Sequence, residues 1–139
     1  MTPVEVVATP GEAERQAILA PLVAFNDAAV GATERHTVAI VIRDAAGAIV
    51  GGLWGTAGYR WLFVQYLVVP ESMRGLGRGR ELMHAAEAEG RRLGCVGLWL
   101  DTFSFQARGF YERLGYRCVG RIDDYPPGEA RFFLCKRID

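Results

Sequence analysis

A short run of glycines and arginines, Arg74-Gly75-Leu76-Gly77-Arg78-Gly79, constrains the fold of this chain more than any other feature. The run follows a strand-like apolar segment and precedes a helical pattern. Closely spaced glycines let the backbone bend tightly and point successive N–H groups at one place. The unpaired N–H groups and positive dipole end of the following helix strengthen the attraction for an anion. The segment therefore predicts a strand–loop–helix unit that binds phosphate, and we call residues 74–79 the glycine–arginine loop.

Three other interpretations of the glycine–arginine loop are weaker. The simplest is a glycine-rich turn with solvated arginines and no ligand. A Rossmann dinucleotide site requires G-x-G-x-x-G, but Arg80 stands where the third glycine belongs. That site also belongs to a sheet with several parallel strands, whereas antiparallel strands are expected before this loop. A P-loop would end in Gly-Lys-Ser/Thr, which the segment lacks.

The pattern around the loop predicts an α/β domain with a mixed sheet and helices on both faces. Strands are expected at residues 37–43, 49–55, 61–69, 96–100, 116–122 and 131–137, and helices at residues 80–93 and 107–114. Short turns join the first three strands, which predicts an antiparallel meander. The strand–helix–strand order around the loop predicts one parallel pair with a right-handed crossover. On the helix at residues 80–93, His84 and Glu87 are expected on the polar face.

The N-terminal segment predicts one more strand and two short helices. Residues 4–8 form a β-branched run that is typical of a strand. Thr9 is expected to cap a helix, with Pro10 in its first turn and Glu12 completing a capping box. Pro21 should interrupt this helix, and residues 26–33 are small and polar, which predicts a loop.

Length and composition limit the class of protein. The 139 residues predict a single domain over residues 1–139, and a hydrophobic content of 50% allows a packed core. Sixteen basic and sixteen acidic residues leave no general attraction for nucleic acid or an anionic membrane. The three cysteines form no metal-binding pattern, so no metal is expected. Without a visible signal peptide or membrane span, the sequence predicts a cytoplasmic protein.

Two motifs resemble those of the GNAT superfamily of N-acetyltransferases. The first is Arg74-x-x-Gly77-x-Gly79 after a strand that ends in Val69-Pro70, and it is similar to the family signature R/Q-x-x-G-x-G/A. The second motif lies further along the chain and is similar to N-x-x-A-x-x-x-Y-x-x-x-G-[FY]. The two motifs occur in the family's order, which makes the resemblance much more specific than either alone.

In the second motif, Ala107, Tyr111, Gly115 and Tyr116 match the family pattern in register, while Ser104 stands where asparagine is commoner. The resemblance extends over nearly the whole chain and implies a GNAT-like fold. In that family the strand before the loop carries a bulge and splays from its parallel neighbour. The pantetheine arm of the cofactor lies between the two strands, and the loop holds the pyrophosphate.

The resemblance implies that acetyl-CoA is the cofactor and that strand and loop residues bind it. The expected cofactor-binding residues are Leu67, Val68, Val69, Arg74, Gly75, Leu76, Gly77, Arg78, Gly79, Arg80 and Ser104. The resemblance also implies a catalytic role for Tyr111. Transfer from a thioester to an amine passes through an oxyanion and expels a thiolate, and a phenol nearby can donate a proton or hydrogen bond as that charge appears. The simpler alternative is that Tyr111 is a half-buried helix tyrosine.

A base that takes the proton of the amine is harder to identify. Some relatives use a glutamate on the strand before the loop, but residues 63–65 contain no acidic side chain here. Asp101, at the end of the expected parallel strand, is the best acidic candidate for a catalytic role. Its alternative is a strand-end or helix-capping carboxylate. Asp27 and Glu34 are weaker candidates.

The acceptor side is expected to be lined by Asn26, Trp54, Tyr66 and Tyr125, with core packing as the alternative for each of them. The leading hypothesis is an enzyme that moves an acetyl group from acetyl-CoA directly to a primary amine of a small molecule or peptide. The alternative is a non-catalytic sensor that binds acyl-CoA. No nucleic-acid or membrane partner is expected, and a homodimer is an expectation by analogy with the family alone.

Overall fold

The computed structural model describes residues 2–139, which form two compact units, residues 2–33 and residues 34–139. The first unit contains one helix, α1 (Glu12–Val30). The prediction of two helices separated at Pro21 is wrong, because α1 continues through this proline. A helix can lose the one hydrogen bond that a proline cannot donate when its neighbours, here alanine and leucine, are strong helix formers.

Two further N-terminal predictions are also wrong. Residues 4–8 form no strand, and no strand of residues 2–139 pairs with them. A β-branched run becomes a strand only when a neighbouring strand accepts its hydrogen bonds. The helix begins after Gly11 and no side chain caps it, so the capping box at Thr9 does not form. Residues 26–30, expected in a loop, are the last turns of α1.

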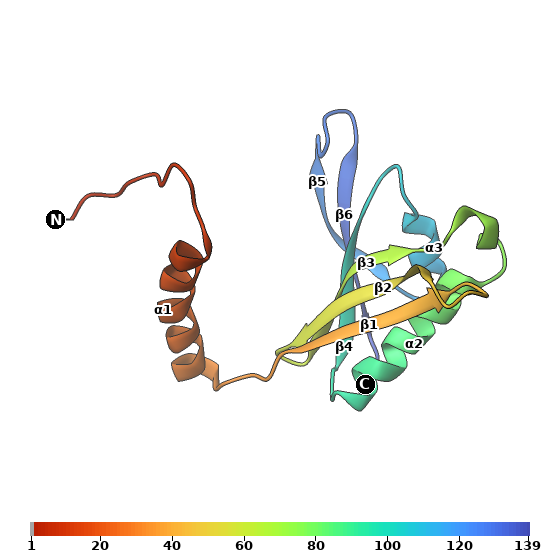
Figure 1. The fold of residues 1–139 in the computed structure, drawn as a ribbon, viewed down its shortest axis with the longest axis horizontal. Helices are drawn as coiled ribbons and strands as arrows, with labels where there is room; N and C mark the ends of the chain where they lie inside the picture. Colours follow the sequence, from red (N-terminus) through yellow and green to blue (C-terminus); the bar gives the residue numbers. More distant parts are fainter. Residues whose placement is uncertain (1) are drawn as a thin grey trace. The chain divides into compact units, whose positions relative to one another are not determined.

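The second unit is built on a six-stranded mixed sheet. Its strands are β1 (His36–Arg43), β2 (Ile49–Gly58), β3 (Trp61–Val68), β4 (Gly97–Phe103), β5 (Arg117–Asp123) and β6 (Ala130–Arg137), in the order β1-β2-β3-β4-β6-β5. Only the β3–β4 pair is parallel. The predicted meander and the single parallel pair are therefore confirmed (Figure 1).

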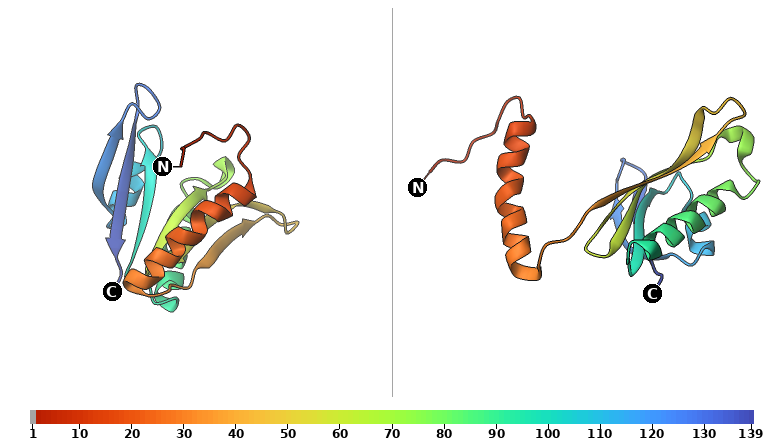
Figure 2. Two further views of the ribbon diagram at one scale, coloured as in Figure 1. Left: turned by 90° about the vertical axis from the view of Figure 1, so that its left-hand side faces the viewer. Right: turned by 60° about the horizontal axis from the view of Figure 1, so that its bottom comes forward.

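Both helices of the second unit lie on the same face of this sheet. α2 (Arg78–Arg92) packs across β1 to β4 (Figure 2), and α3 (Arg108–Arg113) follows β4. Apolar side chains at helical spacing, among them Leu82, Met83 and Ala86, are buried against the inward side chains of the strands. The opposite face, which we call the distal face, is covered by no helix of residues 34–139.

Glu87 corrects the expected polar face of α2. It is 4% exposed, and the ammonium group of Lys136 on β6 lies 2.6 Å from one of its carboxylate oxygens. Lys136 pairs with Leu98 of β4, which places its side chain on the helix-covered face. Helical periodicity indicates which residues share a face, but it does not show that α2 reaches far enough across the sheet to meet a lysine there.

Replacing Lys136 by methionine should lower the free energy of unfolding by roughly 2 kcal/mol. The substitution leaves the Glu87 carboxylate buried without a counter-charge, which is costlier than losing a surface ion pair. Urea unfolding of the two proteins measures the difference. The double variant Glu87→Gln/Lys136→Met should recover part of the loss. An unchanged midpoint for Lys136→Met would show that the pair contributes nothing.

Candidate active site

β3 and β4 separate before either strand ends. Their pairing runs from Trp61 and Gly97 to Val64 and Leu100 and then stops, although β3 continues for four residues and β4 for three. A bulge at Gln65 bends β3 at this point. We call this divergence the splay. β2 pairs with one edge of β3 along the splay, but the edge at residues 65–68 that faces β4 is paired with no strand of residues 2–139. The backbone groups on this edge are therefore free to bind an extended ligand.

The glycine–arginine loop leads from this edge of β3 into α2. Gly75 and Gly77 have φ angles of 78° and 79°, in the left-handed region that favours glycine. The N–H groups of Gly75, Leu76 and Gly77 donate no hydrogen bond to any of residues 2–139. No side chain caps the fifteen-residue helix that follows. Free donors at a helix N-terminus can hold an anion, and we call these three N–H groups the anion site.

The arginines of the loop have different neighbours. Arg78 forms an ion pair with Glu81 at 2.7 Å, one turn along α2. Arg74 donates through Nε to the carbonyl oxygen of Val69 at 3.3 Å, which ties the loop back to the end of β3. The loop is thus fixed at both ends, while its central N–H groups remain unpaired.

The two sequence motifs meet where α2 and α3 come together. A side chain at Gly79 would come within 3.1 Å of the Phe110 ring, which is tighter than ordinary contact, so glycine favours this close approach of the start of α2 to α3. The Phe110 ring in turn lies edge-on against Tyr111, with 5.0 Å between ring centroids. The anion site and Tyr111 are therefore held on one side of the splay by adjoining helices.

Tyr111 is 9% exposed. Burial raises the pKa of its phenol, and the negative charge of Asp101 raises it further. The ordinary pKa of a phenol is about 10, so Tyr111 stays protonated at neutral pH and well into the alkaline range. Tyr111 also packs against Tyr116, whose hydroxyl is the one fully enclosed side-chain N or O atom without a hydrogen-bond partner in residues 2–139.

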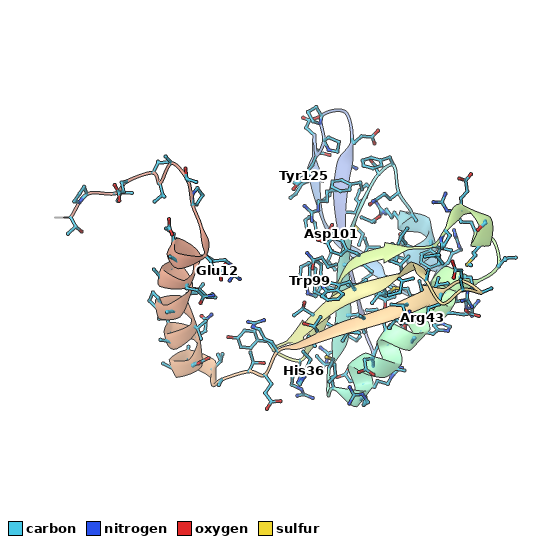
Figure 3. All side chains as sticks on the ribbon, viewed as in Figure 1. Glu12, His36, Arg43, Trp99, Asp101 and Tyr125 are labelled. Carbon is cyan, nitrogen blue, oxygen red and sulfur yellow. The ribbon has the colours of Figure 1, made fainter. Side chains whose placement is uncertain are left out.

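Asp101 lies on β4 just beyond Leu100, where the splay begins, and faces the distal side of the sheet. Arg131 of β6 binds both of its carboxylate oxygens, with Nε donating to Oδ1 at 2.9 Å and Nη2 lying 2.8 Å from Oδ2. Nη1 of Arg131 also donates to the Tyr125 hydroxyl at 2.8 Å. Figure 3 shows Tyr125 above Asp101, nearer the tip of the β5–β6 hairpin.

This ion pair argues against Asp101 as a base, because Arg131 already contacts both of its carboxylate oxygens. Sequence reasoning missed Arg131 altogether. It stands in an alternating strand thirty residues beyond Asp101, with no motif around it. Only the register between β4 and β6, in which Phe103 is opposite Arg131, brings the two charges together.

Ser104 is placed differently from the asparagine that it replaces in the motif. Its hydroxyl donates to the Glu129 carboxylate and accepts a hydrogen bond from the backbone N–H of Ala130 at 2.9 Å. These contacts fasten the end of β4 to the start of β6. A bond from Ser104 to the pantetheine arm remains a prediction, and it would require the contact with Glu129 to be released.

The residues expected on the acceptor side fall in different places. Trp54 and Tyr66 are opposite each other on β2 and β3, and both are exposed on the distal face. Tyr125 belongs to the loop between β5 and β6 and contacts Arg131. Asn26 lies in α1, in the other unit, and not in a loop.

A metal site, a membrane span and a reactive cysteine find no support in residues 2–139. Residues 2–139 contain no group of three or more His, Cys, Asp or Glu side chains that could hold a metal ion. None of the helices in that range has the length and apolar character needed to cross a membrane. The three cysteines are unpaired. Burial raises the pKa of the Cys95 thiol, which makes it a poor nucleophile.

Known proteins resemble this chain closely. The model of the "Acetyltransferase (GNAT) family" matches residues 8–116. Acetyltransferase Atu2258 of Agrobacterium fabrum is 40% identical over 127 residues, which are 91% of this chain and 92% of that protein. The blasticidin-S acetyltransferase of Streptomyces morookaense is 44% identical over 93 residues, 66% of this chain and 68% of that protein.

A solved structure agrees with these relatives. The crystal structure of an acetyltransferase from Agrobacterium tumefaciens is 38% identical and has a TM-score of 0.88, covering 99% of this chain and 100% of its own. The family match, the relatives and the fold all indicate a GNAT acetyltransferase, and the free edge of β3 with the anion site beside it suits the cofactor of that family. The chain belongs to the GNAT acetyltransferase family and is an acyl-CoA-dependent acetyltransferase whose cofactor is acetyl-CoA.

Proposed function

We propose that this enzyme transfers an acetyl group from acetyl-CoA directly to a primary amine of a small molecule or peptide. The observation that carries the proposal is the free edge of β3 at residues 65–68, which runs into unpaired N–H groups at the start of α2. An extended pantetheine arm suits the first feature and a pyrophosphate suits the second.

The residues of the splay and the loop fit such a cofactor. Backbone groups of Leu67 and Val68 would bond to the pantetheine arm, as in the addition of a strand, with Val69 continuing towards the loop. The pyrophosphate would be held by N–H groups of residues 75–80, with Arg74, Arg78 and Arg80 contributing charge.

The proposed chemistry uses Tyr111 as the acid. Acetyl-CoA supplies the thioester whose acetyl group is transferred and whose sulfur leaves as a thiol. Tyr111, kept protonated by the raised pKa of its phenol, is suited to donate a proton or hydrogen bond to that sulfur. Direct transfer is favoured over a cysteine-bound route because the Cys95 thiol is buried and its pKa is raised.

The nature of the acceptor is supported by the distal face and by the relatives. Aromatic side chains dominate this face near the splay, where Phe63 and Trp99 stack with 4.1 Å between centroids. Such a surface suits a small, partly apolar amine. One relative is named for blasticidin S, a small molecule, and both curated relatives are acetyltransferases, which favours the enzyme over the acyl-CoA sensor. The unpaired cysteines suit a reducing compartment such as the cytoplasm, and a homodimer remains a prediction by analogy.

The proposal is tested by measuring thiol release from acetyl-CoA over a panel of primary amines and short peptides, with mass spectrometry of the products. We expect acetylated amine to appear in step with free CoA. In a parallel thermal-shift assay, CoA and acetyl-CoA should raise the melting temperature, whereas NAD should not. Stabilisation by CoA without any acetylated product over the panel would favour the sensor instead.

A further inference from the structure

The ion pair between Asp101 and Arg131 is fixed more firmly than a surface pair. Their side chains are 15% and 25% exposed. The guanidinium carbon of Arg131 lies 5.4, 5.0 and 5.5 Å from the ring centroids of Phe103, Tyr125 and Phe133. Cation–π attraction and the bidentate contact both hold the guanidinium in place. Arg131 therefore neutralises the charge of Asp101 permanently, unlike a mobile surface arginine that contacts its partner for only part of the time.

The position of this pair relates it to acetyl transfer. Asp101 follows the last residue of β4 that is paired with β3, so it lies where the splay begins. Tyr111 lies on the helix-covered side of the sheet and Asp101 faces the distal side. The charge of Asp101 is nevertheless one of the causes, after burial, of the raised pKa of Tyr111. The pair therefore lies on the distal face at the place where β3 and β4 diverge.

Tyr125 adds a directional group to the pair. Its oxygen accepts a hydrogen bond from Arg131, so its own O–H is left to donate elsewhere. Tyr125 is 41% exposed. Arg131 therefore orients two side chains at once, the carboxylate of Asp101 and the hydroxyl of Tyr125, without needing to touch the acceptor itself.

We propose that Arg131 is a positioning residue that sets acceptor selectivity: by balancing Asp101 and orienting Tyr125, it removes the advantage that multiply charged amines would gain from the Asp101 carboxylate. The inference rests on the proposed function, because it places the acceptor at the distal side of the splay. An ammonium group near a balanced pair gains a hydrogen-bond acceptor but little net Coulomb attraction, so a second ammonium group adds nothing there. Without Arg131, the unpaired Asp101 carboxylate would attract the second ammonium group.

Hexylamine and hexamethylenediamine test this idea because they differ by one ammonium group. In Arg131→Gln, kcat/KM for the diamine divided by that for the monoamine should rise about three- to tenfold over the wild-type ratio, as one uncompensated charge near the acceptor implies. The KM for acetyl-CoA should not change. In Asp101→Asn the ratio should fall below the wild-type value, and Asp101→Asn/Arg131→Gln should return it towards that value.

Arg121 provides a matched control on the neighbouring strand. It lies on the helix-covered side, over the ring of Phe132 and paired with Asp123. Arg121→Gln removes the same charge and should leave the ratio unchanged. An unaltered ratio in Arg131→Gln, or equal losses for both amines, would mean that Arg131 is only structural.

A binding measurement separates this inference from the proposed function. Isothermal titration of the two amines into CoA-saturated protein gives the same selectivity ratio without turnover. If wild type acetylates no amine but the binding ratio shifts in Arg131→Gln as expected, the proposed function is wrong and the role of Arg131 stands. If neither amine binds to any of these proteins, the inference about Arg131 is overturned.

Discussion

Gly77→Glu is expected to weaken acetyl-CoA binding about a hundredfold. The new carboxylate would lie beside the unpaired N–H groups of the glycine–arginine loop, and a like charge within roughly 5 Å of a pyrophosphate costs about 3 kcal/mol at an effective dielectric constant of 20. Gly77 has a φ of 79° and directly precedes α2 as its N-cap. Isothermal titration with acetyl-CoA measures the loss directly, and the thermal shift produced by CoA should disappear in parallel.

Gly47 is the matched control for this substitution. It has a φ of 86°, and a side chain there would meet no atom within 4 Å, as at Gly77. It lies in the turn between β1 and β2, outside the anion site. Both variants should lose roughly 1–2 kcal/mol of stability to the left-handed backbone, but only Gly77→Glu should lose acetyl-CoA. Equal affinities for acetyl-CoA in the two variants would rule out the loop as the pyrophosphate site.

Tyr111→Phe should lower kcat by about a hundredfold to ten-thousandfold, the range expected for a general acid. The affinity for acetyl-CoA should change little, because the ring and its packing against Phe110 and Tyr116 are kept. Steady-state kinetics on an amine identified from the panel, together with titration of acetyl-CoA, would separate the two effects. Full activity in Tyr111→Phe would show that another group, or water, protonates the leaving sulfur.

Tyr116→Phe controls for the loss of a phenol from the same cluster. The substitution keeps the ring that packs against Tyr111, so kcat should be unchanged. Urea unfolding and the same kinetic assay compare the two variants. A drop in kcat as large as that of Tyr111→Phe would mean that packing in this cluster, and not proton donation, limits the rate.

The raised pKa of Tyr111 also predicts the alkaline side of the pH profile. Burial and the charge of Asp101 both disfavour the phenolate, so the acid form persists above the ordinary phenol pKa of about 10. We therefore expect no fall in kcat below pH 10 that depends on Tyr111. An alkaline limb well below pH 10 that vanishes in Tyr111→Phe would contradict this assignment of the acid.

Much of the second unit could be predicted from the sequence because its signals are local. Alternating strands with short turns specify an antiparallel meander, and a helix with one apolar face between two strands specifies a right-handed parallel crossover. The glycines of the loop require a tight backbone whatever surrounds them. The N-terminal segment could not be predicted in this way. A strand at residues 4–8 depends on a partner, and Pro21 weakens a helix without being certain to end it.

The sequence by itself determined the glycines of the glycine–arginine loop, the register of the Tyr111 motif, the antiparallel meander and the parallel crossover, since each depends on residues close together in the chain. Only the tertiary structure decided that Glu87 is buried against Lys136, that Ser104 is bound to Glu129 and that Asp101 is held by Arg131. These pairs join residues 25 to 49 positions apart. Their meeting depends on strand register and on the position of α2 across the sheet, and no local pattern contains either.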